Sequence, residues 1–167
     1  ILLRNVLSRK EIENLTTVID QMYEEYLQQS DVSPNSEFDR RNVMEENDLF
    51  IKLMDHTKIF PVVLELMGHY ILLSMSEVIV RPHTPESKGI LHTDGGQAMR
   101  QIRVSQTSLP LQIKVQYFLT DIKETDSGNF TVVPGSHNRP FPESGFRDGP
   151  YIPDALQILA HAGDAVV

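Results

Sequence analysis

Near the start of the chain, apolar residues repeat with the period of an α-helix. Apolar side chains recur at helical spacing between Ile12 and Tyr26, directly after a Ser8–Glu11 segment that has the form of a capping box. Leu7 and Ile12 occupy the two positions of a hydrophobic staple. The pattern therefore predicts an amphipathic helix from Arg9 to about Leu27.

The pattern beyond this helix predicts a loop, two short helices and then a series of strands. The expected elements are a polar surface loop over 28–48, helices over 49–56 and 61–67, and strands over 71–80, 113–119, 130–133, 156–159 and 165–167. Helices come first and short strands with polar turns follow. This order indicates an α+β chain in which helices buttress an antiparallel sandwich or barrel.

Composition and charge exclude several classes of function. The 167 residues suit one domain, and 40% of them are hydrophobic. The formal net charge of −8 would repel nucleic acid and anionic membrane surfaces, and no apolar run approaches the roughly 18 residues of a membrane span. The absence of cysteine excludes disulfides, thiolate metal sites and a cysteine nucleophile. We expect a cytoplasmic protein, since a chain without cysteine is compatible with a reducing compartment.

His92 and Asp94 are the most informative candidates for chemistry. On an extended segment, side chains two residues apart point to the same side, so an imidazole and a carboxylate would converge here. With a second histidine they would form a 2-His-1-carboxylate site, which suits Fe(II) and leaves positions for a bidentate 2-oxo acid and for dioxygen. The His-x-Asp pattern is common by chance, however, and Asp94-Gly95 is also a frequent turn dipeptide.

Several further motifs accompany His92-Thr93-Asp94 in a fixed order. They are the helix start Val6-Leu7-Ser8, the helix end Leu66-Met67-Gly68, the strand 111–121, the turn and loop Asp126–His137 with its Pro-Gly-Ser-His sequence, and Ala162-Gly163-Asp164 before a last strand. In this order the motifs resemble the phytanoyl-CoA dioxygenase family of Fe(II)- and 2-oxoglutarate-dependent oxygenases. The resemblance covers nearly the whole chain.

The resemblance implies a double-stranded β-helix (jelly roll) that spans residues 1–167 as a single domain truncated at its C-terminus. It implies Fe(II) as cofactor, 2-oxoglutarate as cosubstrate, dioxygen and a small-molecule substrate, with His92 and Asp94 as catalytic metal ligands. The third ligand, a histidine roughly ten residues after Gly163-Asp164, and an arginine for 2-oxoglutarate are expected beyond Val167. Related halogenases have Ala or Gly in place of the aspartate, so Asp94 favours hydroxylation.

The resemblance also suggests two residues that bind the cosubstrate, and other interpretations remain beside each. Tyr117 occupies a position where the family often has an aromatic side chain beside 2-oxoglutarate, but it also fits a core tyrosine. Arg41, or Arg40, falls near the position at which the family has a basic residue that reaches the cosubstrate. Either arginine also fits a solvated loop.

Two interpretations of the whole chain compete with an oxygenase. One is a jelly-roll domain that binds a metal or small ligand without turnover, and the other is a structural domain whose His-Thr-Asp is a satisfied turn. His137 and His161 are weaker candidates for the third metal ligand. His56, His69 and His83 are expected on the surface.

Overall fold

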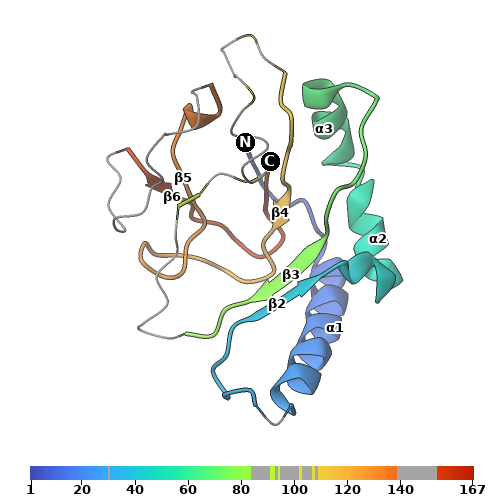
Figure 1. The fold of residues 1–167 in the computed structure, drawn as a ribbon, viewed down its shortest axis with the longest axis vertical. Helices are drawn as coiled ribbons and strands as arrows, with labels where there is room; N and C mark the ends of the chain where they lie inside the picture. The colour runs from blue at the N-terminus through green and yellow to red at the C-terminus, as the bar shows by residue number, and fades with distance from the viewer. Residues whose placement is uncertain are drawn as a thin grey trace.

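The computed structural model describes residues 1–29, 31–83, 91–92, 94, 102, 107, 109–138 and 154–167, and these residues alone are described below. Its helices are α1 (Arg9–Leu27), the 3-10 helix η1 (Val43–Glu45), α2 (Asp48–Met54), α3 (Phe60–Met67) and the 3-10 helix η2 (Ser136–Asn138). Its strands are β1 (Leu2–Leu3), β2 (Phe38–Arg41), β3 (Glu77–Val80), β4 (Gln116–Tyr117), β5 (Thr131–Val132), β6 (Leu156–Gln157) and β7 (Ala165–Val166). Helices α1, α2 and α3 lie on one side of the molecule, and the short β5–β6 pair lies on the other (Figure 1).

Helix α1 confirms the prediction from the sequence, including its first residue. The Ser8 hydroxyl accepts a hydrogen bond from the Glu11 amide, and the Glu11 carboxylate accepts one from the Ser8 amide at 2.7 Å. The capping box thus satisfies two amide groups at the helix start that have no partner within the helix. Leu15 and Ile19, one turn apart, are the buried residues of its apolar face.

The largest sheet joins the two ends of the described chain. Strand β7 lies between β1 and β4 and is antiparallel to both, so that Val166 is opposite Leu2 on one side and Gln116 on the other. The labels for the two termini are neighbours in Figure 1, and the terminal amino group of Ile1 donates a hydrogen bond to the Val167 carbonyl.

The second sheet pairs β2 with β3 and corrects two predictions. Four residue pairs run from Phe38 opposite Val80 to Arg41 opposite Glu77. The predicted loop over 28–48 is therefore wrong in part, because it contains β2 and η1. Phe38 anchors this polar segment against α1, because its ring is buried and the centroid of the ring lies 5.1 Å from that of Tyr26. The predicted strand over 71–80 is also too long, because only Glu77–Val80 is paired.

The remaining predicted strands are present but short. Strands β4, β5, β6 and β7 each keep two residues of the predicted ranges. The two short helices lie within one residue of their predicted starts, and Gly68 ends α3 with a φ of +80°. None of the sheets of the described residues is closed, so the structure is a mixture of helices and small sheets, and the jelly roll stays a prediction. Among the described residues, no helix is long and apolar enough to cross a membrane.

One hydrophobic core lies between α1, α2 and the sheets. Its buried side chains are Val6, Leu7, Leu15, Ile19, Phe38, Val43, Phe50, Ile59, Val78 and Ala165. Val115, Tyr117 and Leu119 pack against this cluster from the segment around β4, whereas Lys114 and Gln116 are exposed. The predicted alternation holds from Lys114 to Tyr117 and places Lys114 on the opposite face from the core, but Phe118, which was expected on the outward face, is buried.

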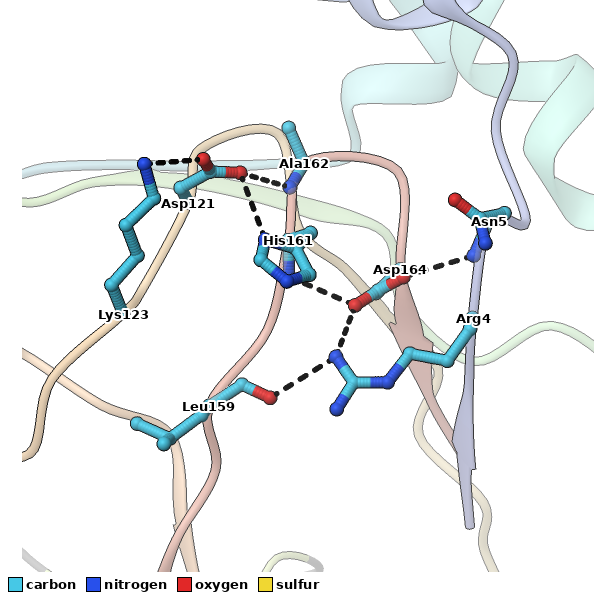
Figure 2. Close-up of polar contacts among 8 residues, drawn as sticks. All are labelled: Arg4, Asn5, Asp121, Lys123, Leu159, His161, Ala162 and Asp164. Carbon is cyan, nitrogen blue, oxygen red and sulfur yellow. Dashed lines mark hydrogen bonds and ion pairs between the residues drawn. The ribbon is translucent and has the colours of Figure 1, made fainter.

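The turn before β7 is fixed by the carboxylate of Asp164, which is 1% exposed. Figure 2 shows this carboxylate between the amino-terminal segment and the turn at 161–163. It accepts hydrogen bonds from the Asn5 amide at 2.9 Å, the His161 amide at 2.8 Å and the Arg4 guanidinium at 2.6 Å. Burial alone would raise the pKa of Asp164, but these three donors together lower it below its ordinary value. We call Asp164, Arg4, Asn5 and His161 the Asp164 cluster. It links the segment after β1 to the start of β7, and both oxygens of the buried carboxylate accept hydrogen bonds.

Gly163 allows the same turn to come close to the amino-terminal segment. Its φ is +94°, and a Cβ at this position would lie 2.9 Å from the Leu7 carbonyl oxygen and 3.0 Å from a methyl group of Ile12. The Gly163 carbonyl accepts a hydrogen bond from the Leu7 amide, and its amide donates one to Phe118. Only glycine meets both the backbone conformation and the space.

Candidate metal centre

The structure brings the side chains of His92 and Asp94 together. His92 Nε2 lies 3.2 Å from Asp94 Oδ1, and both side chains reach solvent, with exposed fractions of 67% and 39%. Neither residue lies in a strand, and Asp94 lies in a turn. The two side chains converge, as their spacing in the sequence predicted.

A lysine and a second carboxylate extend this pair. Lys114 Nζ lies 3.3 Å from Asp94 Oδ2 and 3.3 Å from Glu77 Oε1. Glu77 is the first residue of β3, and Lys114 lies two residues before β4. We call His92, Asp94, Lys114 and Glu77 the Asp94 cluster. It joins three segments that are far apart in the sequence.

The Asp94 carboxylate uses its two oxygens differently. Oδ1 faces the imidazole of His92, and Oδ2 faces the ammonium group of Lys114. Partial burial alone would lower the pKa of Lys114, but the charges of Glu77 and Asp94 and its hydrogen bonds to them raise it above the ordinary value. Lys114 is therefore a permanent cation between two carboxylates at neutral pH, and the three side chains carry a net charge of −1.

The spacing of His92 and Asp94 fits a divalent transition metal. Two ligands on adjacent corners of an octahedron, each about 2.1 Å from the ion, lie about 3 Å apart. The observed 3.2 Å between Nε2 and Oδ1 is close to that separation, although it also suits a direct ion pair. An imidazole nitrogen and a carboxylate oxygen are the donor types that Fe(II) takes in 2-His-1-carboxylate sites. The two residues thus fit part of such a site.

The described residues supply two candidate metal ligands and no complete set. Among them, no three His, Cys, Asp or Glu side chains come close enough together to hold a metal ion. His161 lies beside Asp121, with Nδ1 3.6 Å from Oδ1, and His137 lies in η2. The predicted third ligand falls outside the described residues.

Tyr117 lies on the core side of β4. Its hydroxyl donates a hydrogen bond to the Leu53 carbonyl at 2.8 Å, and its ring packs edge-on against His56 at 6.3 Å. Burial, with a smaller contribution from the Glu11 charge, raises the pKa of Tyr117 far above its ordinary value, so the hydroxyl stays protonated. Since the hydroxyl is occupied, any contact with a cosubstrate would have to use the ring.

Arg41 lies at the end of β2, directly opposite Glu77 in the ladder. Residues directly opposite one another in an antiparallel pair share a face of the sheet, so Arg41 shares a face with the glutamate that reaches Lys114. Its neighbour Arg40 is on the other face and forms an ion pair with Glu46. Of the two candidate arginines, Arg41 is thus the one nearer in register to the Asp94 cluster.

The surface position predicted for His56 is wrong. Its side chain is only 10% exposed, its ring contacts that of Tyr117, and its Nε2 lies 3.7 Å from the Glu11 carboxylate. No motif in the sequence marks this packing, because both partners are distant in the chain. His69 and His83 are exposed, as predicted.

Sequence reasoning did not find Lys114 and Glu77. In the sequence Lys114 looks like an ordinary outward residue of its strand, and Glu77 is a single charge in an apolar run. One signal was present, since a charged residue in the middle of such a run is rarely left without a partner. Its partner depended on tertiary structure and could not be inferred from spacing.

Comparisons with family models, with curated proteins and with solved structures found no match for this chain. The resemblance to the phytanoyl-CoA dioxygenase family therefore rests on the order of motifs in the sequence. The geometry of the Asp94 cluster is an independent observation, since it depends on side-chain positions and not on that order.

Proposed function

We propose that the chain is an Fe(II)- and 2-oxoglutarate-dependent dioxygenase domain that hydroxylates a C–H bond of a small-molecule substrate. The observation that carries the proposal is the 3.2 Å separation of His92 Nε2 and Asp94 Oδ1 within a motif order that resembles such oxygenases. When bound, Fe(II) and 2-oxoglutarate supply the oxidising chemistry, in which dioxygen, 2-oxoglutarate and the substrate give succinate, carbon dioxide and the hydroxylated product.

The residues of the chain contribute binding and charge to this reaction. His92 offers the lone pair of Nε2, and Asp94 offers a negatively charged oxygen that stabilises a divalent cation. The third ligand and the arginine for 2-oxoglutarate are assigned beyond Val167 by the resemblance alone. Arg41 would add positive charge for the 2-oxoglutarate carboxylates. Tyr117 faces the core, on the opposite side of its segment from Lys114, which favours the interpretation of Tyr117 as a core tyrosine.

The test measures succinate formed from 2-oxoglutarate by the natural full-length protein with Fe(II) in air. We expect His92→Ala and Asp94→Ala each to reduce the rate at least about 100-fold, because each removes one of three protein ligands. The matched control is His69→Ala, which removes an exposed histidine at the end of α3 and should leave the rate unchanged. Succinate formation near the parent rate in Asp94→Ala would show that this carboxylate is not a ligand.

A binding domain without turnover is the second candidate. It would use the same pair of residues, since His92 Nε2 and Asp94 Oδ1 lie 3.2 Å apart whether or not 2-oxoglutarate is turned over. In that case the full-length protein would bind a divalent metal through His92 and Asp94 but form no succinate from 2-oxoglutarate. If it binds no metal at all, the Asp94 cluster is a structural ion network.

A further inference from the structure

Lys114 is held in place by a part of the fold that does not depend on Asp94. Its ammonium group lies 3.3 Å from Glu77 Oε1, and Glu77 begins a strand that is paired over four residues with β2. The Glu77 side chain is 24% exposed, the most enclosed of the three members of this ion network. The position of Lys114 is therefore set by β3, and Asp94 is the residue that is brought to it.

An isolated Lys–Asp pair at the surface would contribute little, because solvent screens it and both side chains lose freedom. The arrangement here differs, because one ammonium group bridges two carboxylates from separate segments. Each carboxylate limits the positions that the ammonium group can take. The Lys114 ammonium group is therefore a fixed hydrogen-bond donor for Asp94 Oδ2. The rotation of the Asp94 carboxylate is thereby restricted, and Oδ1 stays directed at His92.

The two oxygens of Asp94 have different partners, and this arrangement suits a carboxylate that binds a metal through one oxygen only. The second oxygen of such a ligand is commonly hydrogen-bonded by a neighbouring group that fixes its orientation. A lysine in that role brings a positive charge close to the cation, which on its own would weaken metal binding. Glu77 offsets that charge, so that Glu77, Lys114 and Asp94 together remain negative.

We propose that Lys114 is a positioning residue that orients the Asp94 carboxylate for a divalent metal ion, and that Glu77 anchors Lys114 and keeps the site attractive to cations. The inference rests on the proposed metal site at His92 and Asp94. It goes beyond that site because it assigns roles to two residues that bind neither metal nor substrate.

The test titrates the natural full-length protein with Co(II) in the absence of oxygen and follows the visible absorption of the bound ion. We expect Lys114→Met to weaken Co(II) binding by about tenfold and to alter the absorption spectrum, because the carboxylate loses its orientation. Lys114→Arg should bind within about threefold of the parent, since it restores a cation that can bridge both carboxylates. Glu77→Gln should also weaken binding, because it removes the anchor and one negative charge.

The matched control is Lys123→Met. Lys123 also pairs with an aspartate at the surface, with Nζ 3.1 Å from Asp121 Oδ2, but it lies outside the Asp94 cluster. This variant should bind Co(II) like the parent. If Lys114→Met does not fold, as judged by circular dichroism, Glu77→Gln and Lys114→Arg carry the test.

The outcomes separate this inference from the proposed function. If the parent binds Co(II) and Lys114→Met binds it equally well or more tightly, Lys114 is not a positioning residue, and the metal site stands without it. If the variants behave as expected but the parent forms no succinate from 2-oxoglutarate, the positioning role stands and the oxygenase assignment fails. If the parent shows no Co(II) binding that His92→Ala removes, both proposals are wrong.

Discussion

Two aspartates in this molecule, Asp164 and Asp94, each pair with a basic side chain but in opposite environments. Asp164 is 1% exposed and accepts hydrogen bonds from two backbone amides and an arginine. The Asp94 side chain is 39% exposed, and its partners are a histidine and a lysine that are themselves partly in solvent. A fully satisfied carboxylate holds two segments together, whereas one with solvent access and ionisable neighbours is open to a ligand.

The comparison also shows why the charge of an aspartate does not by itself indicate function. Both carboxylates lie near a turn, and both have a cationic partner within 3.3 Å. They differ in the kind of donor. Backbone amides cannot leave Asp164 without unfolding the turn, whereas Asp94 Oδ1 faces the side chain of His92, which can turn to admit a metal ion between the two.

The largest effect is expected from neutralising Asp164. Asp164→Asn should destabilise the protein by about 3 kcal/mol, because it removes a charge-assisted interaction with Arg4 and sets an amide group against backbone donors. Asp94→Asn should change stability by less than about 1 kcal/mol, because its ion pairs are exposed to solvent. Urea unfolding of both variants checks the difference. Equal losses in the two variants would remove the distinction between a structural and an open carboxylate.

A smaller effect is expected from Gly163 in the same turn. Gly163→Ala should destabilise the protein by about 2 kcal/mol, because the new methyl group would press on the Leu7 carbonyl in addition to straining the backbone. Gly128→Ala is the matched control, since Gly128 also has a positive φ, of +77°, but nothing lies within 4 Å of its Cβ position. It should lose only about 1 kcal/mol. Similar unfolding midpoints for the two variants would show that the close approach at Gly163 does not restrict the turn.

The smallest effect is the pH dependence of the Asp164 contribution. The pKa of Asp164 is lower in the folded protein than its ordinary value of 3.8, so the ionised form stabilises the fold above that pH. That stabilisation should be lost as the pH falls below about 4 and through the folded value. The difference in unfolding free energy between the parent and Asp164→Asn should therefore shrink in acid. A difference that is constant from neutral pH to acid would mean that the hydrogen-bonding shape of the side chain matters and its charge does not.

The helices were predicted well because their signals are local. Ser8 and Glu11 mark the start of α1 through contacts within one turn, and Gly68 marks the end of α3 through its own backbone. The strands were predicted with the wrong lengths because pairing depends on a distant partner. Residues 71–76 have a strand-like composition, but β2 pairs only with Glu77–Val80, and Asn42 with a φ of +59° ends that ladder.

The candidate site shows the same division between local and distant signals. The spacing of His92 and Asp94 was enough to predict that their side chains meet, because only one residue separates them. Lys114 comes from a segment 20 positions later, and no rule of spacing connects it to Asp94. The jelly roll, the iron and the 2-oxoglutarate remain predictions from the resemblance, and the succinate assay tests them directly.

The order of strands in the largest sheet has a consequence for how the protein folds as it is synthesised. Strand β7 lies between β1 and β4, although it is made last of the three. Leu3 can meet its partner Ala165 only after the intervening chain has left the ribosome, so this sheet has a high contact order. Helix α1 does not depend on this sheet in the same way, because α2 and Phe38, which it contacts, follow soon after it in the chain. We therefore expect Leu2 and Leu3 to lack their strand partners in the nascent chain until residues 165–166 have left the ribosome, and to be accessible to chaperones until then.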